Sequence, residues 1–180
     1  MPRKKHALVI GGTGMLANVC VALAQKGYIV SIIGRTRLKF QRIISDSPVD
    51  SIFPIIVDYN SSELIDEVEN VIEEKGAFDL IVSWTPNYNS LERICEMNRG
   101  IDNFRLFHVK GSRRYFRDET IQIPDNCNYR EVFLGFIMEN EHSRWLTHGE
   151  ISDGVINQIE TDQPTGIIGQ IKTYELRPES

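Results

Sequence analysis

The stretch LVIGGTGMLA, residues 8–17, places a short apolar run directly before three glycines. The run at 7–10 predicts a buried strand, and apolar residues at helical spacing predict a helix over 15–26. A glycine-rich turn between such elements lets the backbone approach a pyrophosphate, and the helix N-terminus directs free N–H groups toward it. The stretch therefore predicts a phosphate-binding strand–turn–helix unit.

Short apolar runs continue to alternate with amphipathic segments through the first two-thirds of the chain. Further strands are expected at 28–33, 52–57, 78–83 and 104–109, and helices at 38–44, 62–75 and 90–98. This alternation is typical of an α/β protein. With right-handed crossovers it predicts a Rossmann-type doubly wound parallel sheet, in a three-layer α/β/α arrangement.

The rhythm changes after Gly111. Residues 113–128 are polar without a helical stripe, and a further strand is expected at 132–137. Thr147 and Glu150 have the spacing of a capping box that opens a helix, and a last strand is expected at 165–174. We expect a single NAD(P)-binding domain over 1–180, with its cofactor-binding core at 1–112 and an irregular segment, strand, helix and tail at 113–180.

Composition excludes several classes of function. The 180 residues carry a net charge of −5, which disfavours nucleic-acid binding, and no apolar run is long enough for a signal peptide or a membrane span. The three cysteines, at 20, 95 and 127, lack Cys or His companions at metal spacing. We expect a cytoplasmic protein with free thiols and no metal.

The end of the second strand carries arginine where an NAD site usually carries an acid. In Gly34-Arg35-Thr36-Arg37, the position of Arg35 suits a 2′-phosphate and so favours NADP(H) over NAD(H). Arg37 is either a second phosphate contact or part of a solvated helix start, and Lys39 is interpreted as solvated.

Later strand ends add candidates for the same ligand. Asp58 and Tyr59 are placed to meet an adenine edge, although Asp58 equally suits a turn with Asn60. Pro86 keeps the turn after the fourth strand extended, so that its preceding residues face the ligand edge. The expected cofactor contacts are Gly11, Gly12, Thr13, Gly14, Met15, Leu16, Arg35, Arg37, Asp58, Tyr59, Ser83, Trp84 and Thr85, with packing as the alternative role of Trp84.

Residues 7–112 resemble the short-chain dehydrogenase/reductase superfamily. The loop GGTGMLA is similar to that of its atypical and extended members, with Ala17 at the third glycine position, and Gly34-Arg35 is similar to the NADP-type strand end. Asp58 matches the acid that contacts adenine in the family. The resemblance implies an NADP(H)-dependent oxidoreductase, as a homodimer or homotetramer.

The catalytic half of the family pattern is missing. Ser112 stands at the end of the fifth strand, but no tyrosine is followed four residues later by lysine: Glu119 follows Tyr115, and Phe133 follows Tyr129. The asparagine-rich turn after the fourth strand is replaced by SWTPN. Ser112 and Tyr115 are the catalytic candidates that remain.

Three functional hypotheses follow. In the first, the chain is similar to compact flavin and biliverdin reductases, which pass hydride to a conjugated acceptor that takes its proton from solvent. In the second, Ser112 with Tyr115 or Tyr129 forms an unusual acid site, aided by Lys110 or Arg113. In the third, as in NmrA-like regulators, NADP(H) is bound as a signal. A SAM-dependent methyltransferase is a weaker rival because the acidic second-strand end is absent.

Two further features bear on ligands and partners. The cluster Lys110, Arg113, Arg114 and Arg117 suits an anionic substrate, or is a solvated loop. The C-terminal PTGIIGQIKTYELRP either caps the sheet edge or pairs with another subunit. His108, inside a predicted strand, is interpreted as a core histidine.

Overall fold

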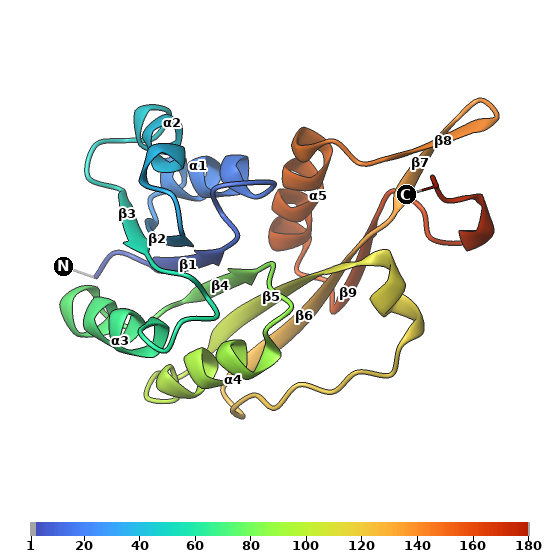
Figure 1. Ribbon diagram of the computed structural model, residues 1–180. Helices are drawn as coiled ribbons and strands as arrows, with labels where there is room; N and C mark the ends of the chain where they lie inside the picture. The colour runs from blue at the N-terminus through green and yellow to red at the C-terminus, as the bar shows by residue number, and fades with distance from the viewer. Residues whose placement is uncertain (1–2, 180) are drawn as a thin grey trace.

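A seven-stranded parallel sheet forms the centre of the computed structural model, which describes residues 3–179 (Figure 1). Its strand order is β3-β2-β1-β4-β5-β6-β9. The strands are β1 (His6–Ile10), β2 (Ile29–Gly34), β3 (Ile52–Ile56), β4 (Leu80–Ser83), β5 (Phe104–Gly111), β6 (Cys127–Leu134) and β9 (Thr165–Ile168). The α-helices are α1 (Ala17–Gln25), α2 (Phe40–Ser45), α3 (Leu64–Lys75), α4 (Tyr88–Met97) and α5 (His148–Thr161). The predicted doubly wound α/β fold is confirmed.

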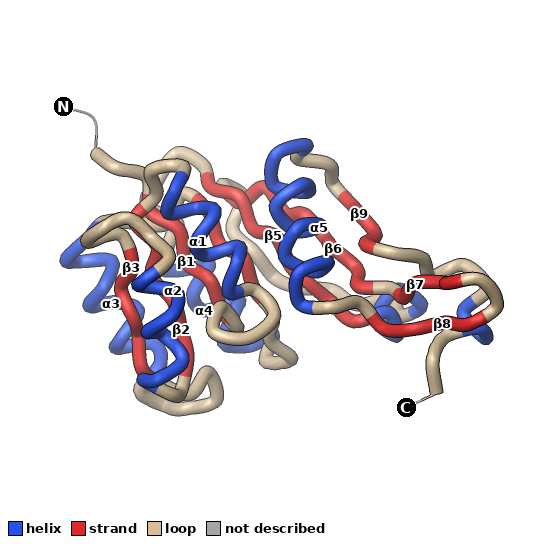
Figure 2. The backbone as a smooth tube through the Cα atoms, turned by 90° about the horizontal axis from the view of Figure 1, so that it is seen from above, coloured by secondary structure: helices blue, strands red, loops and turns tan. Residues whose placement is uncertain are grey.

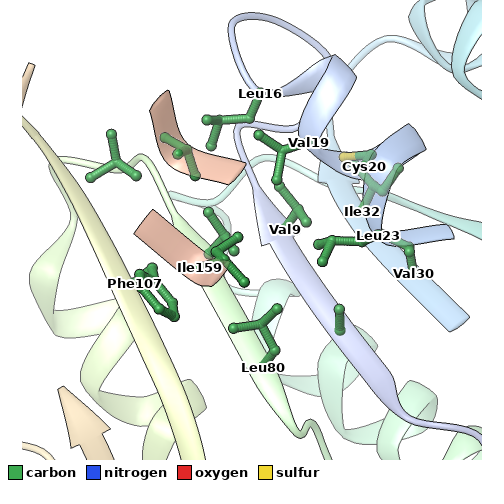
Figure 3. Close-up of a cluster of buried hydrophobic side chains, with 14 of the residues drawn as sticks. Val9, Leu16, Val19, Cys20, Leu23, Val30, Ile32, Leu80, Phe107 and Ile159 are labelled. Atoms are coloured by element: carbon green, nitrogen blue, oxygen red, sulfur yellow. The ribbon is translucent and has the colours of Figure 1, made fainter. Parts of the chain in front are cut away.

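Helices cover both faces of the sheet. Alternate residues of β1 enter two separate apolar clusters: Val9 packs with α1, α2 and α5, and Leu8 packs with α3 and α4. Figure 3 shows the first cluster, where Val9, Ile32 and Phe107 of the sheet meet side chains of α1 and α5. Burying each such side chain contributes about 1.5–3 kcal/mol. The central strands are apolar throughout because neither face meets water.

The connection from β5 to β6 contains no α-helix. A short 3-10 helix, Ser112–Phe116, is followed by extended chain, as the polar sequence of this segment indicated. Ile121 and Ile123 pack against the same apolar cluster as α3 and α4. The Asn126 side chain donates to the carbonyl of Ile101 at 2.8 Å and so anchors the end of the segment. An extended segment thus covers this part of the sheet in place of a helix (Figure 1).

The strand predicted at 132–137 is misplaced at both ends. β6 begins at Cys127, where polar residues pair with β5 along a partly exposed stretch, and it ends at Leu134. At Gly135 the backbone meets Gln170 so closely that a Cβ would collide with it, and the chain then leaves the sheet. The strand predicted at 165–174 also ends early, because Gly169 takes a positive φ of 75°.

A two-stranded hairpin, β7 (Phe136–Glu139) and β8 (His142–Trp145), was not predicted. It projects beyond the sheet beside the C-terminal tail (Figure 2). Arg144 of β8 forms ion pairs with Glu139 and Glu150, both at 2.7 Å. Glu150 belongs to the predicted capping box with Thr147, which is present at the start of α5. Arg144 therefore fixes the hairpin to that helix.

No helix within residues 3–179 is long and apolar enough to cross a membrane. The same described part of the chain holds no group of three His, Cys, Asp or Glu side chains arranged for a metal ion. Although Cys95 and Cys127 are far apart in sequence, they belong to the same apolar cluster, and both thiols are free.

Candidate functional site

The carboxyl ends of β1 and β4 meet at the point where the strand order reverses. Two cavities lie along this edge, one of about 320 Å³ beside the glycine loop and one of about 1100 Å³ above β5 and β6. Both are lined by Met15, Tyr59, Trp84 and His148, so they adjoin. Ligands of open α/β sheets bind at such a switch point. We call the two the loop cavity and the main cavity.

The three loop glycines have different roles. Gly11 turns the chain with a φ of 88°. A Cβ on Gly12 would lie 2.7 Å from Cys20 Sγ and 2.8 Å from Ile32, so this glycine lets α1 pack against the sheet. A Cβ on Gly14 would have no other atom within 4 Å, and the backbone there is therefore open to a ligand.

The N-terminus of α1 carries no side-chain cap and no acidic residue in its first turn. The Ala17 amide donates to the Gly14 carbonyl at 3.1 Å, and the positive dipole end of the helix is available to an anion. Thr13 and Met15 line the loop cavity, whereas Leu16 is fully buried in the core and lines neither cavity. Ser152 of α5 donates to the Met15 carbonyl at 2.8 Å and holds the loop in place.

Arg35 lines the loop cavity at the end of β2. Its guanidinium lies 3.8 Å from the Asp58 carboxylate, and the two side chains are 72% and 42% exposed. Such an exposed pair is worth little, so Arg35 remains available to a phosphate. Lys39 also lines the cavity, and Arg37 does not.

Asp58 forms the turn that was the alternative interpretation of its position. Its carboxylate accepts from the Asn60 N–H at 2.9 Å. Tyr59 lines both cavities, and its carbonyl accepts from the Ser90 hydroxyl at 3.2 Å. Asp58 therefore supports the turn that presents Tyr59.

The three candidates at the end of β4 differ in whether they line a cavity. Ser83 is fully buried and lines neither cavity. Thr85 lines the main cavity and accepts from the Asn87 N–H at 3.1 Å. Trp84 lies between the ends of β1 and β5: its Cβ is 3.1 Å from a Cβ position on Gly11, and its ring is 3.8 Å from one on Gly111. Trp84 packs against the apolar cluster and lies where the two cavities meet.

Ser112 lines the main cavity, but its tyrosine neighbour is not the predicted one. Tyr115 lies outside the cavity lining and packs edge-on against Phe133, with ring centroids 5.2 Å apart. The Ser112 hydroxyl instead donates to the hydroxyl of Tyr174, 3.4 Å away. Tyr174 lines the cavity from the C-terminal tail, and the Arg177 guanidinium lies 4.3 Å from its ring centroid. Sequence spacing gave no signal for this pairing.

His108 is a core histidine, as predicted. It is fully buried, and its Nδ1 lies 2.8 Å from the Tyr129 hydroxyl. Burial, with smaller effects from Lys110 and Arg114, lowers the pKa of His108 to about 3, so the ring is neutral at pH 7. Tyr129 points to His108 and does not line the main cavity, and burial raises the pKa of its hydroxyl.

The similarity of this chain to known proteins lies in its structure. No protein-family model matches it, and no curated protein matches it by sequence. A betaketoacyl-ACP reductase from Bacteroides thetaiotaomicron is 14% identical, with a TM-score of 0.69 over 96% of this chain and 100% of that one. A bulky-bulky ketone specific alcohol dehydrogenase from Comamonas testosteroni is 11% identical, with a TM-score of 0.71 over 97% and 90%.

A third similar structure is an actinorhodin polyketide ketoreductase with NADPH, 11% identical, with a TM-score of 0.68 over 93% of this chain and 97% of that one. Further similar structures are short-chain dehydrogenases/reductases by name. Identity this low is informative about the backbone and not about chemistry. The chain has the fold of the short-chain dehydrogenases/reductases.

Proposed function

We propose that this protein is an NADP(H)-dependent oxidoreductase that transfers hydride between the cofactor and a small acceptor. The observation that carries the proposal is the pair of adjoining cavities, which extends from Arg35 to Ser112 across the switch point. A dinucleotide bound there would have its phosphates at the glycine loop and its reactive end in the main cavity. The NADPH of the similar polyketide ketoreductase structure supports the choice of cofactor.

The residues of the loop cavity fit the dinucleotide. The open backbone at Gly14 and the uncapped N-terminus of α1 would hold the pyrophosphate. Arg35 and Lys39 would hold the 2′-phosphate, because both line the cavity with cationic side chains. Tyr59, which lines both cavities, would cover the ligand where they meet.

Tyr174, oriented by the hydrogen bond from Ser112, would supply the proton when the acceptor is a carbonyl compound. NADPH, when bound, supplies the hydride, and the acceptor oxygen takes a proton from the Tyr174 hydroxyl. Ser112 donates to that hydroxyl oxygen, which leaves the phenol proton free for the acceptor. Solvent then returns the proton to Tyr174.

The test is to measure NADPH binding and then to follow NADPH absorbance with carbonyl compounds, quinones and flavins. Binding with turnover on one of these classes is the expected result. The second candidate function, an NADP(H) sensor, is favoured by the lack of any tyrosine followed four residues later by lysine. Tight binding without turnover on the whole panel would support the sensor, and failure to bind would contradict both.

A further inference from the structure

The main cavity is lined by two kinds of basic side chain. The first kind is neutralised: Lys110 lies 2.9 Å from Glu131, and Arg114 lies 2.7 Å from Glu119. Lys110 is only 4% exposed and is surrounded by aromatic rings, including that of Tyr88 at 5.6 Å. The charges of these two cations are therefore balanced by carboxylates within the protein.

The second kind has no acidic partner. Arg113, Arg117 and Arg177 line the cavity, are exposed, and form no ion pair with any carboxylate in residues 3–179. Two carboxylates, Glu175 and Glu179, line the same cavity without neutralising them. Three guanidiniums against two carboxylates leave this lining positive, although the whole chain carries −5. A local excess of positive charge attracts an anion, even on a protein whose net charge is negative.

The walls of the cavity are aromatic. The chain contains six tyrosines and two tryptophans, and five of these eight line the main cavity: Tyr59, Trp84, Tyr88, Trp145 and Tyr174. Aromatic walls bury planar ligands at low entropic cost and favour stacked or edge-on ring contacts. The cavity therefore combines flat apolar walls with guanidinium groups suited to bidentate contact with oxyanions.

We propose that the main cavity binds a small planar molecule that carries a carboxylate or phosphate group, and that Arg113, Arg117 and Arg177 hold this anion. The inference rests on the proposed function for its role, since the bound molecule is the hydride acceptor of that reaction. It deepens that function by naming the acceptor class. Two of the arginines come from the segment after β5 and the third from the C-terminal tail, so the site forms only when the tail is docked.

The two tryptophans of the protein can report ligand binding at this site through their fluorescence. Trp84 and Trp145 are the two tryptophans of the chain, and both line the main cavity. Tryptophan fluorescence of the full chain without dinucleotide is titrated with benzoate, phenyl phosphate and the neutral benzyl alcohol. We expect both anions to change the fluorescence at about tenfold lower concentration than benzyl alcohol, as charge-assisted hydrogen bonds predict. The stronger of the two anions identifies the preferred group.

Matched variants test the named residues. The double substitution Arg113→Gln/Arg117→Gln, and separately Arg177→Gln, should weaken anion binding about tenfold and leave benzyl alcohol binding unchanged. Arg93→Gln is the control, because Arg93 is an exposed arginine of α4 outside the cavity. All replaced side chains are exposed, and circular dichroism with thermal unfolding verifies that each variant folds. Equal binding of anions and benzyl alcohol, or unchanged anion binding in both arginine variants, would overturn the inference.

The proposed function is tested separately by NADPH binding. Loss of anion preference with intact NADPH binding counts against the inference alone. Intact anion binding with no NADPH binding counts against the proposed function alone.

Discussion

The loop cavity and the main cavity lie on one sheet edge but are built in different ways. The loop cavity consists mostly of residues that follow β1, β2 and β3 directly, together with Trp84 and His148, which it shares with the main cavity. The main cavity collects side chains from the ends of β4 and β5, from β8, from the start of α5 and from the C-terminal tail. The loop cavity offers glycine backbone and the cations of Arg35 and Lys39 to a ligand, and the main cavity offers hydroxyls, five aromatic rings and three guanidiniums that form no ion pair within residues 3–179.

This difference teaches where specificity resides in the fold. A backbone cradle accepts any ligand with a pyrophosphate, because it contacts what all such ligands share. In a cavity lined by side chains from distant segments, the ligand preference depends on the residues that each segment contributes. Ser112 and Tyr174, for example, are 62 residues apart and meet only in the folded chain. Substitutions in each region test this contrast.

The largest effect is expected at the glycine loop. Gly12→Val would push a side chain into Cys20, Ile32 and Val9, and we expect a loss of about 3 kcal/mol in the free energy of unfolding, measured in urea. Gly14→Ala is the control, because its Cβ meets open space. It should unfold nearly as the wild type does and yet bind NADPH less well. Equal destabilisation of the two variants would contradict the roles assigned to these glycines.

The next largest effect concerns catalysis in the main cavity. Tyr174→Phe removes the hydroxyl bonded to Ser112 and should lower kcat with a carbonyl acceptor about 100-fold, as expected for loss of a general acid. NADPH affinity should not change. Tyr115→Phe should retain full activity, since Tyr115 does not line the cavity. Full activity of Tyr174→Phe would instead favour a proton taken from solvent.

The third effect concerns cofactor choice in the loop cavity. Arg35→Ala should weaken NADPH binding about tenfold, because a charge-assisted contact to the 2′-phosphate is lost, and should leave NADH binding nearly unchanged. Isothermal titration measures both affinities. Arg37→Ala, outside the cavity, is the control. If Arg35→Ala weakens NADPH and NADH equally, Arg35 does not contact the 2′-phosphate.

The smallest effect lies in the buried layer beneath the main cavity. The pKa of His108 is lowered to about 3 in the folded chain. As the pH falls through 6.5, the unfolded chain therefore binds a proton at this residue and the folded chain does not. His108 thus costs no stability above pH 6.5, and the free energy of unfolding should decrease by about 1 kcal/mol from pH 6.5 to 5.5 through this residue alone. His108→Gln should lose this part of the pH dependence.

Urea unfolding at a series of pH values measures the effect of His108. His142→Gln is the matched control, because His142 is exposed on β8. The same pH dependence in wild type and His108→Gln would show that His108 is not the group responsible.

Much of the first region could be predicted from sequence. The strand and helix pattern through β5, the glycine turn and the capping box at Thr147 all depend on periodicity or on contacts within a few residues. The placement of Arg35 at a strand end followed from the same pattern. The predicted boundary is wrong where polar residues begin a strand, as in β6, because pairing with β5 and not local preference holds these residues in the sheet.

The second region required the tertiary structure. The parallel α/β sheet and its phosphate loop can be predicted from sequence, since strands buried on both faces are apolar throughout and tight turns need particular residues. Only the folded chain decided that Tyr174 and not Tyr115 faces Ser112, and that Lys110 and Arg114 are neutralised while Arg113, Arg117 and Arg177 are not. The physical reason is that hydrogen bonds and ion pairs depend on distances between side chains from separate segments, which no spacing along the chain encodes.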